Sequence, residues 1–441
     1  MNQVYLDRMK DILGNRYNDY LESLEKTPFR SIRLNKIKYE DFVKNINMPL
    51  EKISYDKDGY YLNNLEKYGN HPYHHLGAFY FQEPSAMMPI NLYDFKGDEL
   101  VLDLCASPGG KSSQVARNLT SGVLVSNEID SKRCNVLFQN MERLGFSNVV
   151  ITNNSPNDLA KVFSNTFDVI VLDAPCSGEG MMRKEEAARE NWTLENVKLC
   201  QKRDIEIINE ANKMLKKGGK LIYSTCTFSP EEDCQMVEYI ISLGYKLLPI
   251  KETLKKCATE GFIKNTLRVY PMDKGEGQFM ALLEKESDAS GSIKLAKKVI
   301  DKDINIVKKF LETYTTLDIN TQDIVKIGSR YYLSKLNFDY TKLNVKNLGV
   351  ELGEVIKNRF EPYHDLFKAL GHFFKNQIRL SVCDKLVDHY LHGEEINYPV
   401  PDGFGVIIVD DLVLGGFKAS FGHIKNHYPK GLRHLKLYYE D

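Results

Sequence analysis

The sequence has 441 residues, of which 42% are hydrophobic and 27% are charged, and its formal net charge is −1. This length predicts roughly two to four structural units, and the composition is ordinary for a globular protein. The near-neutral charge excludes a protein that is basic throughout, although a local basic surface for nucleic acid would be averaged away.

The eight cysteines are scattered and form no disulfide framework, so they predict free thiols in a reducing compartment. The sequence has no C-x-x-C pair and no zinc-type spacing of cysteine and histidine, so we expect no metal site. The first residues, MNQVYLDRMKDIL, have no positively charged lead into an apolar run, which predicts no signal peptide. No apolar segment is long enough to cross a bilayer, and we expect a cytoplasmic protein.

The first 45 residues or so combine an amphipathic helical pattern with a segment of alternating charge. In this segment, TPFRSIRLNKIKYEDF, apolar and basic residues alternate, which predicts a strand with one basic face. A solvated face and contact with a partner are both compatible with this pattern. The apolar positions of the helix are Tyr5, Leu6, Met9, Ile12 and Leu13, and the basic positions of the strand are Arg30, Arg33 and Lys36.

From about residue 80 to 285, apolar β-rich runs alternate with helical segments. The runs are VLDLCA, GVLVSNEI, NVVITN, FDVIVLDAP and GKLIYSTCT, and the helical segments include SKRCNVLFQNMERLG and CQKRDIEIINEANKMLKKGG. Continuous apolar strands that alternate with helices predict a parallel sheet covered on both faces. The stretch LRVYPMDKGEGQFMALLEK predicts a closing hairpin around a glycine-rich turn.

The stretch LDLCASPGGKSS (residues 102–113) ends like a phosphate-binding loop. Cys105, however, stands where that pattern requires its first glycine, and the adjacent Gly109 and Gly110 break the dinucleotide pattern. What remains is a buried strand, a tight glycine turn and a helix that begins near Lys111. In an open α/β sheet, ligands bind at such a turn.

Acids and cysteines follow successive predicted strands. Asp103 lies just before the glycine turn, Glu128 ends the second strand, Asp173 and Cys176 follow the fourth, and Cys226 follows the fifth. The carboxyl ends of parallel strands meet in one crevice, and an acid after the second strand suits the ribose hydroxyls of an adenosine ligand. Each acid alone would more often be a turn or cap residue, but together they favour a ligand site.

The two loop cysteines are either small buried hydrophobic residues or nucleophiles. An adenosine-type cofactor beside loop thiols points to methyl transfer onto a poor nucleophile, such as carbon 5 of a pyrimidine. A thiolate that adds to carbon 6 gives carbon 5 the electron density it needs to attack a methyl sulfonium. The spacing alone leaves open whether Cys176 or Cys226 attacks.

The motifs LDLCASPGGK, DAPCSGEGMMRK and YSTCTFSPEE, in this order, resemble those of the Sun-type RNA cytosine-5 methyltransferases. Within that family the sequence is most similar to the bacterial RsmF-like ribosomal RNA enzymes, over nearly its whole length. GAFYFQEPSAM resembles the entry to the catalytic domain, and RVYPMDKGEGQF resembles its closing hairpin. The tail, GFKASFGHIKNHYPKGLRHL, is similar to the PUA-like RNA-binding end of the RsmF group.

The resemblance implies S-adenosyl-L-methionine as cofactor, with Glu128 on its ribose and Asp173 near the methyl group and the cytosine edge. It also implies that Cys226 is the nucleophile and that Cys176 assists breakdown of the adduct. The implied cofactor loop consists of Cys105, Ala106, Ser107, Pro108, Gly109, Gly110 and Lys111.

The adenine side of the site departs from the family pattern. Ser155 stands where the family usually has an acid near the adenine amino group, so Asn153, Asn154 or a backbone carbonyl are the alternatives. Arg133 either reaches the cofactor or a nearby acid, or is an exposed helix charge.

The tail segment between residues 418 and 436 is basic, contains no acid and includes the aromatic residues Phe421 and Tyr428. Such a segment suits contact with a nucleic-acid backbone together with base stacking. Arg183 and Lys184, which follow the P-C turn, are expected to hold phosphates that flank the target base. The basic residues of the tail are Lys418, Lys425, Lys430, Arg433 and Lys436.

We therefore expect an α/β chain with a doubly wound Rossmann-like methyltransferase sheet, an antiparallel hairpin and α+β flanking regions. The expected units are an N-terminal RNA-positioning domain (1–75), a catalytic domain (76–286), an intermediate domain (287–375) and a PUA-like domain (376–441). The expected function is cytosine carbon-5 methylation of RNA, most readily ribosomal RNA, by a monomer. The alternatives are a transfer RNA enzyme, a non-catalytic RNA-binding or ribosome-assembly factor, and a DNA cytosine methyltransferase that uses Cys176.

Overall fold

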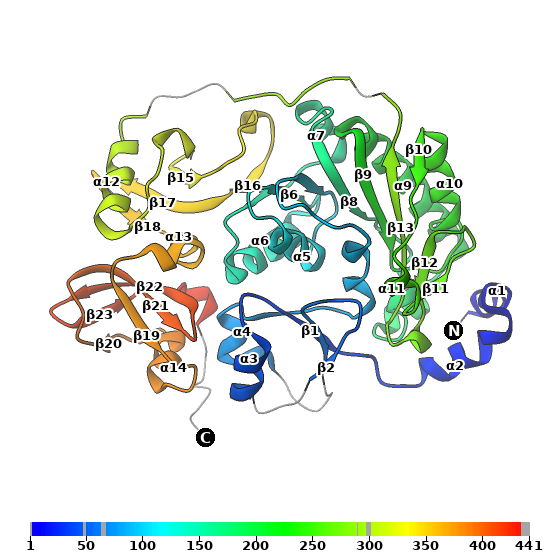
Figure 1. Cartoon of the computed structure of the whole chain (residues 1–441), viewed down its shortest axis with the longest axis horizontal. Helices are drawn as coiled ribbons and strands as arrows, with labels where there is room; N and C mark the ends of the chain where they lie inside the picture. Colours follow the sequence, from blue (N-terminus) through cyan, green and yellow to red (C-terminus); the bar gives the residue numbers. More distant parts are fainter. Residues whose placement is uncertain (1, 47–49, 63–67, 289, 297–300, 434–441) are drawn as a thin grey trace.

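The computed structural model describes residues 2–46, 50–62, 68–288, 290–296 and 301–433. These residues form four β-sheets. The largest, called the central sheet, is built mainly from the middle part of the sequence (Figure 1). In this described part of the chain, no helix is both long and apolar enough to cross a membrane.

The central sheet contains the five predicted parallel strands in the order β7-β6-β5-β8-β9. Their interior residues are almost all buried, as expected for strands that are covered on both faces. The predicted parallel sheet is confirmed. The strands are β5 (Leu100–Asp103), β6 (Val123–Asn127), β7 (Val149–Thr152), β8 (Phe167–Asp173) and β9 (Leu215–Thr225).

Helices cover both faces of this sheet. On one face, α5 (Gly110–Asn118) and α6 (Ser131–Leu144) pack into an apolar cluster with alternate strand residues. On the other face, α7 (Pro156–Val162), α9 (Leu194–Met214) and α10 (Cys234–Ser242) pack into a second cluster with the remaining ones. The doubly wound fold is therefore confirmed, and its cause is the continuous apolar sequence of each strand.

The predicted hairpin closes one side of the sheet. β13 (Gln278–Lys285) is antiparallel to β9 and to β12 (Thr266–Val269), so the hairpin is confirmed. Two short strands complete this edge: β10 (Tyr245–Leu247) pairs with β13, and β11 (Thr259–Glu260) pairs with β12. Two further short helices, which the central unit also contains, are α8 (Glu186–Glu190) and α11 (Glu252–Lys255).

The N-terminal region divides into two parts that lie far apart in Figure 1. The helices α1 (Gln3–Leu13) and α2 (Tyr17–Leu24) pack beside the central unit, where their apolar residues join Trp192. The rest forms a sheet in the order β2-β3-β1-β4 with two helices. Its elements are β1 (Ser31–Leu34), α3 (Tyr39–Ile46), β2 (Glu51–Lys52), β3 (Gly59–Tyr61), α4 (Pro72–His75) and β4 (Phe79–Phe81).

Two expectations for this region need correction. β4 pairs with β1, so the N-terminal sheet extends beyond the expected boundary at residue 75. The expected basic face is only partly at the surface: Arg33 is buried and donates hydrogen bonds to Gln82 and to Ser113 on α5. Lys36 is exposed, and its Nζ donates to the carbonyl of Gly145. These cations dock the N-terminal sheet onto the central unit.

The region after the central unit forms a small sheet and also completes the large one. β16 (Val345–Leu348) pairs antiparallel with β7, so the expected intermediate domain supplies an edge strand to the catalytic sheet. The small sheet has the order β14-β15-β17-β18 and lies beside α12. The elements are α12 (Ile304–Tyr314), β14 (Ile324–Ile327), β15 (Arg330–Leu333), β17 (Val350–Ile356) and β18 (Arg359–Pro362).

The C-terminal unit returns to the N-terminal sheet, and the two lie side by side in Figure 1. Both contribute to one apolar group, the shared cluster, which includes Phe42 and Tyr73 from the first unit and Tyr390 and Ile407 from the last. The Tyr73 hydroxyl also donates a 2.8 Å hydrogen bond to Asp410. The elements are α13 (His364–Leu370), β19 (Gln377–Leu380), α14 (Lys385–His392), β20 (Ile396–Asn397), β21 (Gly403–Val409), β22 (Leu412–Ser420) and β23 (His423–Asn426).

Candidate active site

The carboxyl ends of the central strands bring the predicted acids and cysteines to one edge of the sheet. Asp103 pairs in register with Ser126 of β6 and Val171 of β8. Asp173 of β8 pairs in register with Ser224 of β9, two residues before Cys226. The parallel register thus places the motifs side by side although they are far apart in the sequence.

The glycine loop joins β5 to α5 and is tied to the next strand. Gly109 has a φ of 110°, and a Cβ added there would lie 2.7 Å from Met141 Cε, so this turn needs glycine. The Ala106 N–H donates to the Asn127 carbonyl at 2.9 Å. The Ser107 hydroxyl donates to the Arg133 carbonyl at 2.9 Å, and Arg133 Nη2 donates to the Ser107 carbonyl at 3.0 Å.

Glu128 follows β6 and is buried, with 2% of its surface exposed. Its Oε1 accepts the N–H of Asp130 at 3.0 Å, and its Oε2 lies 3.5 Å from Arg133 Nη1. Oε2 accepts no hydrogen bond from any residue that the structure describes. A buried carboxylate oxygen without a donor is unusual, and a ribose hydroxyl is a donor of the right kind. Arg133 reaches both this acid and the glycine loop.

The adenine side of the site is occupied by amide groups that bind one another. Asn153 and Asn154 each bond to the carbonyl of Asn344, which directly precedes β16, at 2.9 and 3.0 Å. The Ser155 hydroxyl caps α7, because it accepts the Asp158 N–H at 3.2 Å and donates to its carboxylate at 2.7 Å. Sequence reasoning missed Asn344, since only strand pairing across the chain brings it here.

Burial sets the protonation of two groups behind the glycine loop. Asp103 accepts a 2.6 Å hydrogen bond from Ser112, and desolvation raises the pKa of its carboxyl to about 7. Desolvation also raises the pKa of the Cys105 thiol well above its ordinary value. Cys105 is therefore a neutral thiol beside the loop rather than a reactive thiolate.

Asp173 stands at the open edge of the site and is held by three donors. Lys111 Nζ lies 2.8 Å from Asp173 Oδ2, the Ser224 hydroxyl donates to Oδ1 at 2.7 Å, and Gln278 Nε2 donates to Oδ1 at 3.3 Å. The lysine side chain is 9% exposed and the aspartate side chain 36% exposed. Lys111 thus joins the glycine loop to the acid. Ser224 and Gln278 were missed, although Ser224 lies within the YSTCT motif.

The two predicted cysteines face each other. Cys176 Sγ lies 3.2 Å from Cys226 Sγ, and both are free, partly exposed thiols. The hydrogen bond between them, together with desolvation, raises the pKa of the Cys176 thiol well above its ordinary value. Cys176 therefore keeps its proton and can donate it to the sulfur of Cys226.

Buried contacts hold the two cysteine loops together. Gly180 donates its N–H to the Cys226 carbonyl at 2.8 Å, and a Cβ added to Gly180 would lie 2.9 Å from that oxygen. The Glu179 carboxylate accepts the Phe228 N–H at 2.8 Å and the Trp192 indole N–H at 2.8 Å. The sequence offered a signal for these contacts, because Glu179 and Gly180 lie in the DAPCSGEG motif.

Three family models match consecutive parts of the chain and together match most of it. Residues 1–84 match the N-terminal domain of 16S rRNA methyltransferase RsmF, 90–284 match 16S rRNA methyltransferase RsmB/F, and 368–434 match the methyltransferase RsmF PUA domain. The chain belongs to the RsmB/F methyltransferase family. The central RsmB/F match contains the glycine loop and both cysteines.

Two relatives in this family match nearly the full length. The ribosomal RNA small subunit methyltransferase F of Shewanella sediminis is 29% identical over 99% of this chain and 98% of its own. The Vibrio vulnificus protein of the same name is 28% identical over 98% and 97%.

Solved structures match about two thirds of the chain. A methyltransferase homolog protein from Pyrococcus horikoshii is 28% identical, with a TM-score of 0.56 over 65% of this chain and 95% of its own. The structure of NSun6 from Pyrococcus horikoshii with SFG is 21% identical, with a TM-score of 0.60 over 65% and 99%, and shows the same fold.

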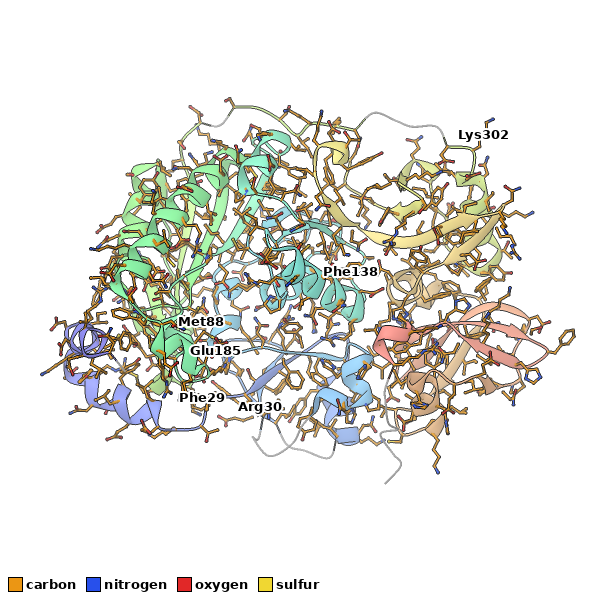
Figure 2. All side chains as sticks on the ribbon, turned by 180° about the vertical axis from the view of Figure 1, so that it is seen from behind. Phe29, Arg30, Met88, Phe138, Glu185 and Lys302 are labelled. Atoms are coloured by element: carbon orange, nitrogen blue, oxygen red, sulfur yellow. The ribbon has the colours of Figure 1, made fainter. Side chains whose placement is uncertain are left out.

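Arg183, which we expected to contact RNA, lies in the interior of the protein. Arg183 is buried and forms a bidentate ion pair with Glu276, at 2.8 and 2.5 Å, while its Nη1 donates to the Ser23 carbonyl. The prediction that it holds a phosphate is corrected, because its charge is already neutralised inside the protein. The Arg183 guanidinium lies 5.3 Å from the ring of Phe29, a residue labelled in Figure 2. Lys184 is exposed.

The RsmF PUA match covers the predicted RNA-binding tail. Lys418 and Lys425 are exposed and pair across β22 and β23, and Lys430 is also exposed. Arg433 is only half-buried and lies against Gly393, and Lys436 lies outside the described residues. The tail's two aromatic residues differ: Tyr428 is buried in the shared cluster, whereas Phe421 is 90% exposed.

Proposed function

We propose that this RsmB/F methyltransferase transfers a methyl group from S-adenosylmethionine to carbon 5 of a cytosine in RNA through a covalent adduct with Cys226. The observation that carries the proposal is the pair of thiols 3.2 Å apart beside the Asp173–Lys111 ion pair, at the strand ends next to the glycine loop. This combination suits covalent catalysis at a carbon that is a poor nucleophile.

The residues present fit the implied cofactor. Gly109 lets the turn pack closely against α6, and Glu128 Oε2 is a buried acceptor that a ribose hydroxyl would satisfy. Arg133 holds both groups in place from α6. Ser155 stays a candidate for the adenine contact, although its hydroxyl caps α7. S-adenosylmethionine, when bound, supplies an electrophilic methyl group.

The protein's own part in the reaction follows from the state of the two thiols. The Cys226 thiolate forms a bond to carbon 6 of cytosine, and the electron pair moves towards carbon 5, which becomes nucleophilic. After methylation, a base removes the proton of carbon 5 and the bond between Cys226 and carbon 6 breaks. Cys176 holds a proton 3.2 Å from the Cys226 sulfur, which suits assistance to the departing thiolate. Asp173 and Lys111 are placed to bind the edge of the base.

We propose RNA of the small ribosomal subunit as substrate, because the full-length relatives carry the name ribosomal RNA small subunit methyltransferase F. The target base must leave its stack to reach the thiols. The proposed RNA contacts beyond the site are Lys184, Lys418, Lys425, Lys430 and Arg433, with Phe421 as a stacking surface. Action as a monomer in the cytoplasm stays a prediction.

The test is methyl transfer from radiolabelled S-adenosylmethionine to small ribosomal subunits, purified ribosomal RNA, transfer RNA and DNA. We expect labelled 5-methylcytosine in ribosomal RNA with the wild type, none with Cys226→Ala, and a trapped protein–RNA adduct with Cys176→Ala. If Cys176→Ala is inactive and Cys226→Ala stays active, the cysteine roles are reversed. If the wild type binds RNA but labels no nucleic acid, a non-catalytic role replaces the proposal.

A further inference from the structure

Glu232 lies behind the two cysteine loops and contacts neither thiol. It follows β9, in the YSTCTFSPEE motif, and its side chain is fully buried. Its Oε1 accepts the N–H of Ser177 at 2.8 Å, and its Oε2 accepts the Ser177 hydroxyl at 2.5 Å. Ser177 directly follows Cys176, so this carboxyl holds both the backbone and the side chain next to one thiol.

The same hydroxyl reaches the other cysteine loop. Ser177 Oγ lies 2.9 Å from Thr227 Oγ1, and Thr227 directly follows Cys226. A serine hydroxyl has one proton, which is directed at Glu232, so Thr227 is the donor to Ser177. The hydrogen bonds therefore run in one direction, from Thr227 to Ser177 to Glu232. They join the residue after one thiol to the residue after the other.

The main chain of Glu232 is fixed independently of this network. The Tyr223 hydroxyl donates to the Glu232 carbonyl at 2.6 Å, and the neighbouring Glu231 forms an ion pair with Arg8 of α1 at 2.6 Å. The carboxyl of Glu232 thus adds a second carboxylate link between two loops that Glu179 and Gly180 also join.

We propose that Glu232 is a positioning residue that sets the separation of the two active-site thiols through Ser177 and Thr227. The inference rests on the proposed function only in taking these thiols as the reacting groups. Glu232 binds both the backbone N–H and the hydroxyl of Ser177, so this link constrains the loops more than a hydroxyl pair alone. Covalent catalysis depends on such constraint, because small displacements of a nucleophile lower its rate strongly.

The first test needs no RNA. In a glutathione redox buffer, one oxidised glutathione converts the thiols of Cys176 and Cys226 into a disulfide and yields two reduced glutathiones. The equilibrium constant measures how often the loops bring the sulfurs to bonding distance. The fraction of disulfide is measured by mass spectrometry of the peptide that contains Cys176 and the peptide that contains Cys226.

Thr227→Val removes the hydroxyl at nearly constant volume, whereas Thr227→Ser retains it, and Ser177→Ala removes the middle link. We expect the equilibrium constant to fall about tenfold in Thr227→Val and Ser177→Ala, and to stay near the wild-type value in Thr227→Ser. Glu238→Gln, on the exposed side of α10, is the control, since it changes a nearby acid outside the network. Values within a factor of two of the wild type in both Thr227→Val and Ser177→Ala would overturn the proposal.

The second test measures methyl transfer in the same variants. We expect kcat to fall about tenfold in Thr227→Val while KM for RNA and for S-adenosylmethionine stays unchanged, and Thr227→Ser to restore kcat. A change in KM with kcat unaltered would contradict a positioning role. An equal loss of kcat in Thr227→Val and Thr227→Ser would also contradict it. If the wild type methylates no RNA, the proposed function fails, but the disulfide equilibrium still decides whether Glu232 positions the thiols.

Discussion

Lys111 and Asp173 form an ion pair across the site, with 2.8 Å between Nζ and Oδ2. Lys111 lies in the first turn of α5, and Asp173 ends β8, so the pair connects the proposed cofactor loop with the proposed base-binding edge. The lysine is nearly buried while the acid is partly open to the crevice. A substrate group that enters the site therefore meets the carboxylate first, with the cation behind it.

Replacement of this lysine should impair the chemical step. We expect Lys111→Met to lower kcat for methyl transfer by roughly 10²-fold, because it removes a fixed charge from a partly desolvated site. Lys132→Met, on the exposed side of α6, is the control and should retain wild-type activity. Single-turnover kinetics with labelled S-adenosylmethionine checks the prediction. Equal rates for the two variants would exclude an electrostatic role for Lys111.

The buried pair of Arg183 and Glu276 should contribute to stability rather than to RNA binding. Arg183→Met leaves the Glu276 carboxylate without its partner, and we expect a loss of about 3–5 kcal/mol in the free energy of unfolding. Urea denaturation followed by the fluorescence of Trp192, the single tryptophan, measures it. The double variant Arg183→Met/Glu276→Leu should be more stable than Arg183→Met alone. A variant of normal stability with weakened RNA binding would restore the role predicted from the sequence.

Asp204 should make the stability depend on pH. It is buried in α9, neither carboxyl oxygen accepts a hydrogen bond from a described residue, and desolvation raises its pKa to about 8. The folded state holds this proton above the pH at which the unfolded state loses it, so stability is present at low pH and lost as pH rises towards 8.

Asp204→Asn should remove this dependence. Relative to the variant, the wild type should lose roughly 4 kcal/mol of unfolding free energy between pH 5 and pH 8. Urea denaturation of both proteins at several pH values gives the comparison. Parallel stability profiles for the two proteins would show that Asp204 does not titrate in this range.

Phe421 should lower the free energy of unfolding and raise the affinity for RNA. Its φ of 50° is left-handed, the turn is held by a 2.7 Å hydrogen bond from its N–H to Asp402, and its ring is 90% exposed. Phe421→Gly should raise the unfolding free energy by about 1 kcal/mol. It should also weaken RNA binding by about 1–3 kcal/mol if a base stacks on the ring.

Fluorescence anisotropy with labelled RNA measures the affinity of this variant. Phe373→Ala, which removes an exposed ring outside the β22–β23 hairpin, is the control. In the same assay, Lys418→Gln/Lys425→Gln should reduce the salt dependence of binding by about two phosphate contacts. Unchanged affinity in both hairpin variants would remove this surface from the RNA-binding site.

The sequence was sufficient for the parts of the fold whose signals are local. Apolar runs and glycine turns predicted the parallel strands and the hairpin, and strand ends predicted that Asp103, Asp173 and Cys226 converge. The sequence was not sufficient where two contacting residues are far apart along the chain. Arg183 reads as an exposed cation because Glu276, its partner, lies in another loop, and nothing near Asn344 indicates that β16 joins the catalytic sheet. Burial of this kind depends on tertiary pairing, which periodicity does not contain.

The shared cluster joins the first and last parts of the chain, and this has a consequence for how the protein is made. Phe42 and Tyr73 leave the ribosome early, but Tyr390 and Ile407, against which their unit packs, are translated near the end. The central unit contains its own apolar clusters and can fold in the meantime. The N-terminal sheet must wait with an uncovered apolar face until the residues of the C-terminal unit have been synthesised.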